Sequence, residues 1–355
     1  MKEIENLSIR NFNDKEFERL TELSQTTYPG REISKSNYLQ WEYIQNPDGN
    51  AIITVGEINH KIVSQYIVLP RLFSIDKKLI PGSLSVNTIT HPDFRGNNIF
   101  EKLALETFNR CKQENIFFTI GFPNPVSQPI INKKQIFETS GHLSLLLKPF
   151  NPISTLFCYF KNKKEKTGHE IELIFSDKIL PSKSDVAFFD CDKDAGKYEE
   201  FLKKFNDEKQ NVTFRSLDFL KWRYLNIPVR KYFIFKQESE NKIKAIVIVR
   251  AKYIYGIRCG ILVDLMTHSK SDEVKILLNA INEIARNNKL DLIVSAIPSH
   301  SLEFKLLKNA GFYSFPQFLL PQKLAFIVKR HLAACPDSVT NFRKWFLTFG
   351  DYDIF

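Results

Sequence analysis

Apolar side chains recur every three or four positions in two stretches of the chain, one in each half. The first stretch contains Phe100, Leu103, Ala104, Phe108 and Cys111, and the second contains Val274, Leu277, Leu278, Ile281, Ile284 and Ala285. This spacing predicts two helices that each turn one apolar face towards a core. Each helix is followed by a short apolar run, residues 116–122 and 290–297, which ends just before a proline and predicts a strand.

A strand is also predicted before each helix, at residues 85–91 and 262–268. The order strand, helix, strand in both halves predicts a parallel strand pair joined by a right-handed crossover. The sequence therefore indicates an α/β fold in which each half builds a mixed central sheet flanked by helices.

The two halves also share a motif of aromatic residues and prolines. The matching pairs are Trp41 and Trp222, Tyr43 and Tyr224, and Pro47 and Pro228, each 181 positions apart (222 − 41 for the first pair). Agreement at one fixed offset indicates an internal repeat. Because these aromatic residues occur in both copies, we expect them to pack in the two cores.

The repeat divides the chain into four parts. Copy one is expected at residues 1–150, a connector at 151–183 and copy two at 184–330, while the tail 331–355 is explained by neither copy. Each copy ends with a helix, a glycine (Gly141 or Gly311) and a last apolar strand. A length of 355 residues suits two domains that each bury a core.

Composition limits the partners and the compartment. The formal net charge of +10 favours anionic partners, which include nucleic acid, a membrane surface and phosphorylated small molecules. The five cysteines form no C-x-x-C pair, and neither a signal peptide nor an 18-residue apolar run is found, so we expect a cytoplasmic protein without a transmembrane segment. The seven histidines show no metal-binding spacing, and no metal is expected.

One local cluster leaves two interpretations open. Lys161, Lys163, Lys164 and Lys166 follow the apolar run 156–160. This segment either lies on anionic lipid or forms a solvated linker.

The loop at residues 90–100 carries the clearest chemical signal. It joins a strand to the start of a helix, where backbone N–H groups and the positive end of the helix dipole suit a pyrophosphate. Arg95 can add charge-assisted hydrogen bonds to phosphate oxygens, and Gly96 lets the backbone approach a ligand closely.

This loop resembles that of the GNAT family of acyl-CoA-dependent N-acyltransferases, which reads roughly Arg/Gln-x-x-Gly-x-Gly/Ala. Residues 95–100 read Arg-Gly-Asn-Asn-Ile-Phe, so Asn98 and Phe100 stand where the family has glycine or a small residue. Asparagine can still adopt the positive φ that such a turn needs. The resemblance implies two tandem GNAT-like units. In copy two, residues 269–273 stand in place of the loop, lack the Arg-Gly pair and place acids where phosphates would sit, so we expect copy two to bind no CoA.

The same resemblance implies a set of residues that bind acyl-CoA. They are Ile89, Thr90, Arg95, Gly96, Asn97, Asn98, Ile99, Phe100 and Asn124. In the family, the position of Asn124 flanks the splayed strands where the thioester enters, although a turn-forming role beside Pro125 explains this residue equally well.

We therefore expect an N-acyltransferase that moves an acetyl group from acetyl-CoA to an amine acceptor bound between the domains. Resemblance to tandem GNAT proteins implies an amino-sugar nucleotide in surface-polysaccharide synthesis as the acceptor. No motif supplies a catalytic carboxylate; Asp351 or Asp353 in the tail is the hypothesised holder of the acceptor amine, with a solvated C-terminus as the alternative.

Two other functions remain open on the sequence. A Fem-like aminoacyltransferase also doubles the GNAT fold, but uses aminoacyl-tRNA and needs no CoA loop. A ligand-binding protein without catalysis would explain the departures at Asn98 and Phe100.

Overall fold

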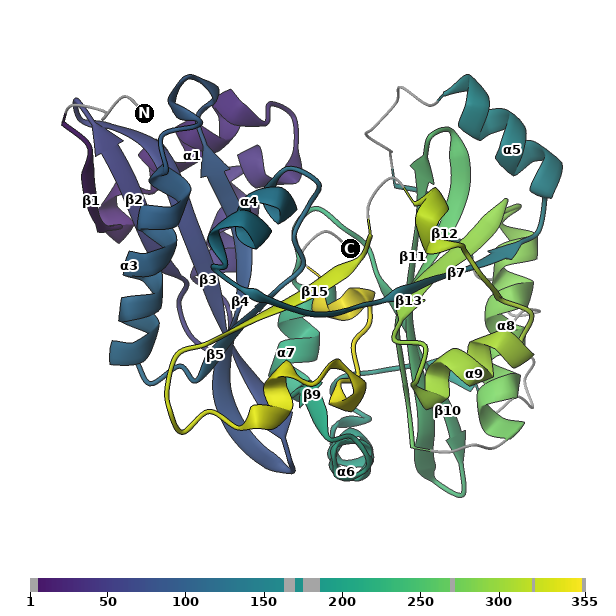
Figure 1. The fold of residues 1–355 in the computed structure, drawn as a ribbon. Helices are drawn as coiled ribbons and strands as arrows, with labels where there is room; N and C mark the ends of the chain where they lie inside the picture. The colour runs from purple at the N-terminus through teal and green to yellow at the C-terminus, as the bar shows by residue number, and fades with distance from the viewer. Residues whose placement is uncertain (1–5, 163–169, 175–185, 269–271, 321–322, 353–355) are drawn as a thin grey trace. The chain divides into compact units, whose positions relative to one another are not determined.

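The computed structural model describes residues 6–162, 170–174, 186–268, 272–320 and 323–352 (Figure 1). By their contacts these residues form two compact units. Unit 1 comprises residues 1–141, 226–229 and 325–342, and unit 2 comprises residues 142–225, 230–324 and 343–355. Each unit is described by itself below.

Unit 1 is built on a mixed sheet with the strand order β1-β2-β3-β4-β5-β15-β6. The strands are β1 Ser8–Asn11, β2 Ile52–Ile58, β3 Lys61–Ile75, β4 Lys78–Thr90, β5 Phe118–Gly121, β15 Ala325–Arg330 and β6 Glu138–His142. Strands β1 to β4 pair antiparallel, β4 and β5 pair parallel, and β15 pairs antiparallel with β5. The helices are α1 Phe17–Thr27, α2 Ser36–Tyr43, α3 Ile99–Gln113 and α4 Ser127–Lys134.

The core of unit 1 forms where α3 packs on the sheet. Leu103, Ala104 and Phe108 of α3 lie in one buried cluster with side chains of β2 and β3, such as Ile52 and Val68. The predicted apolar stripe is therefore the face of α3 that is buried against the sheet, as its spacing requires.

Unit 2 is built on a second mixed sheet, with the order β14-β7-β13-β12-β11-β10-β8. The strands are β14 Tyr313–Ser314, β7 Ser144–Pro149, β13 Leu292–Ile297, β12 Ile257–Thr267, β11 Lys242–Ile254, β10 Phe233–Ser239 and β8 Val186–Phe188. Only β12 and β13 pair parallel among the described pairs of this sheet. The helices are α5 Pro152–Lys161, α6 Ala195–Glu208, α7 Leu217–Leu220 with a π-helical turn Lys221–Leu225, α8 Asp272–Asn287 and α9 Leu302–Asn309; a short strand, β9, spans Asn211–Thr213.

The predicted fold class is confirmed, because both units are mixed sheets flanked by helices and share one order of elements. The repeat residues behave alike: Trp41 and Trp222 are 3% and 4% exposed, and Tyr43 and Tyr224 are also buried. These aromatic residues pack in the cores, as their presence in both copies predicts.

The last strand of each copy lies in the sheet of the other copy. Strand β7, expected to close copy one, pairs with β13 of unit 2, and β15, expected in copy two, pairs with β5 of unit 1. The expected boundaries at residues 150 and 330 follow the sequence repeat. In the structure each of these two strands instead pairs within the sheet of the other copy. A period-two apolar pattern identifies a strand but not the neighbour with which it pairs.

The connector and the tail both contribute to the units. Within the expected connector 151–183, α5 is a regular helix, and the Ile171 N–H donates to the Ala251 carbonyl of β11. Of the expected tail 331–355, residues 331–342 belong to unit 1 and the remainder to unit 2.

Three further observations concern the described part of the chain. None of its helices has the length and apolar character needed to cross a membrane. All five cysteines are free. No group of three or more His, Cys, Asp or Glu side chains in this part is arranged to hold a metal ion.

Candidate active site

Strand β4 contains a β-bulge shortly before its end. Gln65 of β3 pairs with Ile89, but Ile67 pairs with Val86, so β4 carries one extra residue between these pairs. Asn87 lies within the bulge with φ +44°, a conformation that asparagine adopts more readily than most residues.

Polar side chains from α2 and β3 fix this bulge. The Asn87 amide nitrogen donates to the Tyr43 hydroxyl at 2.9 Å and to the Glu42 carboxylate. The Gln65 side-chain amide donates to the Asn87 carbonyl at 2.9 Å. Glu42 is only 3% exposed, so its carboxylate is a buried acid whose partners are protein groups, including the Tyr38 hydroxyl.

The bulge lies where β4 and β5 separate. Their parallel ladder covers only residues 83–85 of β4 against residues 119–121 of β5, although β4 continues to Thr90. The edge of β4 from Val86 to Thr90 that faces away from β3 is therefore outside the ladder. The predicted residues Ile89 and Thr90 lie in this segment, where Ile89 is buried and the Thr90 hydroxyl is 2.8 Å from that of Ser64.

The predicted phosphate loop joins this strand to α3. A 3-10 turn, Pro92–Phe94, leads to Arg95, which is exposed and donates from Nε to the Thr90 carbonyl at 3.1 Å. Gly96 has φ +84°, and no atom lies within 4 Å of the place where a Cβ would project. Asn98 has φ +55° directly before α3, so it adopts the left-handed turn that its place in the motif requires.

The remaining loop residues divide between the loop and the core. The Asn97 amide donates to the Phe94 carbonyl at 3.1 Å and thereby stabilises the loop. Ile99 is 2% exposed, and Phe100 packs edge-on against Tyr66 with 5.6 Å between ring centroids. Phe100 therefore contributes to packing below the loop, at a position where the family has a small residue.

The loop ends at the N-terminus of a 15-residue helix. The first N–H groups of a helix have no acceptor within the helix, and the helix dipole adds partial positive charge there. Together with the exposed guanidinium of Arg95, this end of α3 suits an anionic group.

Asn124 follows β5 and organises the next helix. Its side-chain oxygen accepts hydrogen bonds from the N–H groups of Val126 and Ser127, both at 2.9 Å. This geometry is that of a turn former at the start of α4. The predicted contact of Asn124 with acyl-CoA stays a prediction.

Asp351 lies in the interior of unit 2. Its carboxylate is 3.1 Å from Arg215 and accepts hydrogen bonds from the Thr213 hydroxyl at 2.6 Å and the Thr348 N–H at 2.8 Å. At 1% exposure its oxygens are occupied by these partners. Asp353, the other predicted acid, lies outside the described residues, and the proposed role of either acid in holding an amine stays a prediction.

Unit 2 has an equivalent bulge, but its polar contacts differ. Ile248 pairs with Asp264 and Val249 with Leu262, so β12 also carries one extra residue. Tyr224 donates to Asp264 at 3.3 Å, as its repeat counterpart contacts the bulge in unit 1. Arg215 forms an ion pair with Asp264 at 2.7 Å.

The tail occupies the surroundings of this second bulge. The 3-10 turn Phe349–Asp351 packs on β12 and β13, and the Thr348 hydroxyl donates to Asp264 at 3.1 Å. A Cβ on Gly350 would lie 2.4 Å from the Tyr224 hydroxyl oxygen, so the fit is tight. Burial opposes the charge of Arg215, but Asp264 and Asp351 outweigh it and raise the pKa of the guanidinium.

Sequence reasoning missed Glu42. The residue stands between Trp41 and Tyr43, which were assigned to packing, and its counterpart 181 positions later is Arg223. The available signal was that an acid, Glu42, occupies the position that a base, Arg223, occupies in the other copy. Functional residues should differ between two copies that differ in activity.

Comparison with known proteins is consistent with this geometry. The family model for the acetyltransferase (GNAT) domain matches residues 8–134, which contain the bulge, the loop and α3. The resemblance to the GNAT family is thus confirmed over residues 8–134. A comparison of the sequence with curated proteins finds no match.

Solved structures share the fold over nearly the whole chain. A GCN5-related N-acetyltransferase from Anabaena variabilis has a TM-score of 0.63 at 10% identity, over 92% of this chain and 73% of that one. A probable N-acyltransferase from Enterococcus faecalis has a TM-score of 0.62 at 12% identity, over 92% and 73%. N-myristoyltransferase from Saccharomyces cerevisiae with bound myristoyl-CoA has a TM-score of 0.60 at 13% identity, over 94% and 85%. At these identities the likeness shows a common fold.

Proposed function

We propose that the chain is an N-acyltransferase that takes an acyl group from acyl-CoA and transfers it to an amine, with the donor bound to unit 1. The observation that carries this proposal is the combination in unit 1 of a strand edge outside the ladder, an exposed arginine and a helix N-terminus within residues 86–100. The GNAT family match over residues 8–134 supports the assignment.

In this proposal each part of acyl-CoA has its own contact. The pyrophosphate binds the N–H groups at the start of α3 and the guanidinium of Arg95. The pantetheine arm adds to the edge of β4 from Val86 to Thr90 through backbone hydrogen bonds. The thioester then lies near the bulge at Asn87.

The chemistry needs a neutral amine, a donor for the developing oxyanion and an acceptor for the amine proton. Backbone N–H groups of β4 supply the oxyanion contact in this proposal. Glu42 acts as a positioning residue, because its carboxylate binds the Asn87 side chain in the bulge. Asp351 or Asp353 in the tail stays the proposed holder of the acceptor amine.

Acetyl-CoA is the proposed donor and an amino-sugar nucleotide of surface-polysaccharide synthesis is the proposed acceptor. The net charge of +10 supports an acceptor that carries phosphates. A cytoplasmic location is proposed on the basis of the five free cysteines. Since one structural neighbour holds myristoyl-CoA, donor chain length must be tested directly.

Calorimetry with acetyl-CoA and myristoyl-CoA tests the proposal. Three proteins are compared: the native chain, Arg95→Glu, and Lys78→Glu, which makes the same charge change on an exposed residue at the other end of β4. We expect micromolar donor binding that Arg95→Glu weakens at least about tenfold and Lys78→Glu leaves unchanged.

Other results would contradict the proposal. No binding of either donor would favour an aminoacyltransferase or a protein without CoA-dependent catalysis. An equal loss in both variants would show that general charge, and not the loop, attracts the donor.

A further inference from the structure

Helix α5 of unit 2 has its apolar side chains on the outside. The exposed fractions are 81% for Ile153, 60% for Leu156, 65% for Phe157 and 72% for Phe160. These positions follow the spacing i, i+3, i+4, i+7, so the four side chains form one stripe along the helix. We call this stripe the α5 apolar face.

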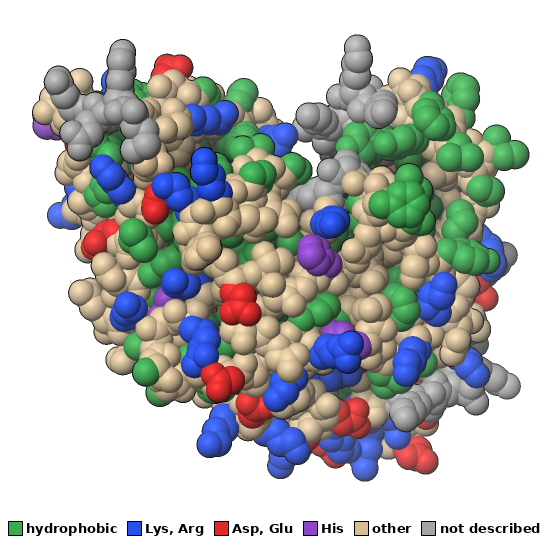
Figure 2. Space-filling model, in the orientation of Figure 1, with side chains coloured by type: hydrophobic (Ala, Val, Ile, Leu, Met, Phe, Trp, Pro, Cys, Tyr) green, Lys and Arg blue, Asp and Glu red, His purple; other side chains and the backbone are tan. Residues whose placement is uncertain are grey.

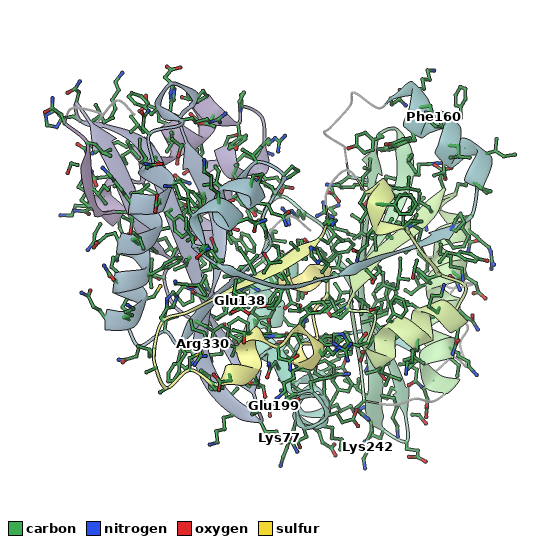
Figure 3. All side chains as sticks on the ribbon, in the orientation of Figure 1. Lys77, Glu138, Phe160, Glu199, Lys242 and Arg330 are labelled. Atoms are coloured by element: carbon green, nitrogen blue, oxygen red, sulfur yellow. The ribbon has the colours of Figure 1, made fainter. Side chains whose placement is uncertain are left out.

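This arrangement is the reverse of the usual one. A helix with such a stripe normally turns it towards a core, whereas no residue of α5 is buried. Figure 2 shows hydrophobic side chains gathered where Figure 1 places α5, and Figure 3 labels Phe160 on this helix.

The opposite side of α5 holds the helix on unit 2. Tyr159 packs edge-on against Tyr255, in the turn between β11 and β12, with 5.7 Å between ring centroids. The N–H of Asn151, directly before the helix, donates to the Asp291 carbonyl at 3.0 Å. Because these contacts fix the orientation of α5, the apolar face is held outward by the unit.

Positive charge borders the α5 apolar face. Lys161 is exposed at the end of the helix, with its ammonium 5.8 Å from the centre of the Phe157 ring. In the sequence, Lys163, Lys164 and Lys166 follow, with the single acid Glu165 among them; these residues lie outside the part of the chain that the structure describes. Aromatic and aliphatic side chains flanked by lysines are typical of helices that lie in the headgroup region of an anionic bilayer.

We propose that α5 docks the chain on an anionic phospholipid bilayer. The α5 apolar face inserts between the headgroups, while Lys161 extends its aliphatic stem along the face and binds lipid phosphate with its ammonium. The site is separate from the donor site of unit 1 and does not depend on the proposed function. The charge favours this occupant over a second copy of the chain, whose own α5 would bring like charges together.

Vesicle sedimentation with the full chain tests the proposal. Vesicles of phosphatidylcholine are compared with vesicles that also contain about 30% phosphatidylserine, at low and high salt. Leu156→Glu is compared with Leu105→Glu, which changes a leucine of similar exposure, 53%, on helix α3. Thermal unfolding checks that both variants fold.

We expect the native chain and Leu105→Glu to bind the anionic vesicles at low salt, and Leu156→Glu to bind at least about tenfold more weakly. Absence of native binding, equal binding by both variants, or binding that ignores phosphatidylserine would overturn the proposal. Analytical ultracentrifugation of the same proteins measures whether the chain forms a dimer. A dimer that Leu156→Glu dissociates, without vesicle binding, would assign the face to a second copy and also overturn it.

Discussion

The two bulges differ in their polar residues. In unit 1 the bulge residue is Asn87, a neutral amide whose partners are Tyr43 and the carboxylate of Glu42. In unit 2 the equivalent residue is Asp264, which pairs with Ile248 beside the bulge and whose carboxylate forms an ion pair with Arg215. In unit 1 the residue at the bulge beside the loop is therefore a neutral amide. In unit 2 the carboxylate of Asp264 accepts a hydrogen bond from Thr348 of the tail.

Glu42→Gln tests the positioning role of Glu42. The substitution keeps the shape and one hydrogen-bond acceptor but replaces the carboxyl group that Asn87 contacts. We expect kcat to fall about tenfold while the affinity for acyl-CoA changes little, because the loop is untouched. Steady-state kinetics with calorimetry measures both quantities.

Tyr38→Phe is the control for Glu42, because it removes a neighbouring contact of the same carboxyl group and leaves Glu42 itself in place. An equal loss of activity in both variants would indicate a packing role for Glu42.

Arg215→Met tests the buried charges around Asp264 and Asp351. Removing the guanidinium leaves two buried carboxylates without their cation, which typically costs about 3–5 kcal/mol. Hydrogen exchange of β12 amides measures the loss within unit 2. Lys204→Met, which breaks an exposed ion pair with Glu200, should cost at most about 1 kcal/mol.

A catalytic role of Asp351 must be tested by a point substitution, because the residue lies in this buried cluster. Trp345 and Asp351 are both 1% exposed, so deletion of residues 345–355 would remove part of the interior of unit 2. Loss of activity after that deletion would not separate catalysis from folding. The point substitution Asp351→Asn, with stability measured alongside activity, makes that separation.

His331 makes the stability of unit 1 depend on pH. Burial, together with Lys329 and Lys112, lowers the pKa of His331 from 6.5 to about 4. In the unfolded chain the His331 imidazole therefore becomes protonated near pH 6.5, whereas in the folded chain it becomes protonated only near pH 4. The stabilising contribution is complete above pH 6.5 and is lost as the pH falls towards 4, by up to about 3 kcal/mol.

Thermal unfolding at about pH 7.5 and about pH 4.5 measures this loss. His331→Gln keeps a polar partner for Thr119 but does not titrate, so it should show a smaller loss. His60→Asn, at an exposed position with positive φ, should behave as the native chain does. An unchanged pH dependence in His331→Gln would exclude His331 as the source.

At the scale of elements, the segment from β4 to α3 shows what sequence can predict. The apolar stripe predicted the face of α3 that is buried, and the predicted strand 116–122 contains β5, Phe118–Gly121. The conformational range of asparagine left the loop turn possible at Asn98, and the structure shows the positive φ that this turn needs.

Two features of these elements, the bulge in β4 and the pairing of β7 and β15, could not be predicted from the sequence. The bulge at Asn87 depends on register with β3, which the sequence of β4 alone does not contain. The exchange of β7 and β15 depends on which sheet edge a strand joins, and an apolar run is equally suitable for either edge.

Substitutions at Asn98 test the loop itself. Asn98→Gly restores the glycine of the family motif and fits a φ of +55°, so donor binding should be retained. Asn98→Val places a β-branched side chain in the left-handed region, at a cost of about 1–2 kcal/mol, and should weaken donor binding. Calorimetry with acyl-CoA compares the two, and equal binding would show that this turn does not form the site.

For the whole molecule, the two units share a fold but differ in what occupies the end of the strand before the crossover helix. In unit 1 the edge of β4 beyond Ser85 is outside the ladder with β5, next to a loop that carries Arg95. In unit 2 the turn Phe349–Asp351 packs on β12 and β13. We therefore propose one donor site per chain, in unit 1.

Hydrogen–deuterium exchange with and without acyl-CoA tests this claim most directly. If unit 1 holds the donor site, the donor should slow exchange in peptides that cover residues 86–101 and leave exchange in β12, Ile257–Thr267, unchanged. Protection of β12 in place of residues 86–101, or protection of neither segment at saturating donor, would contradict it.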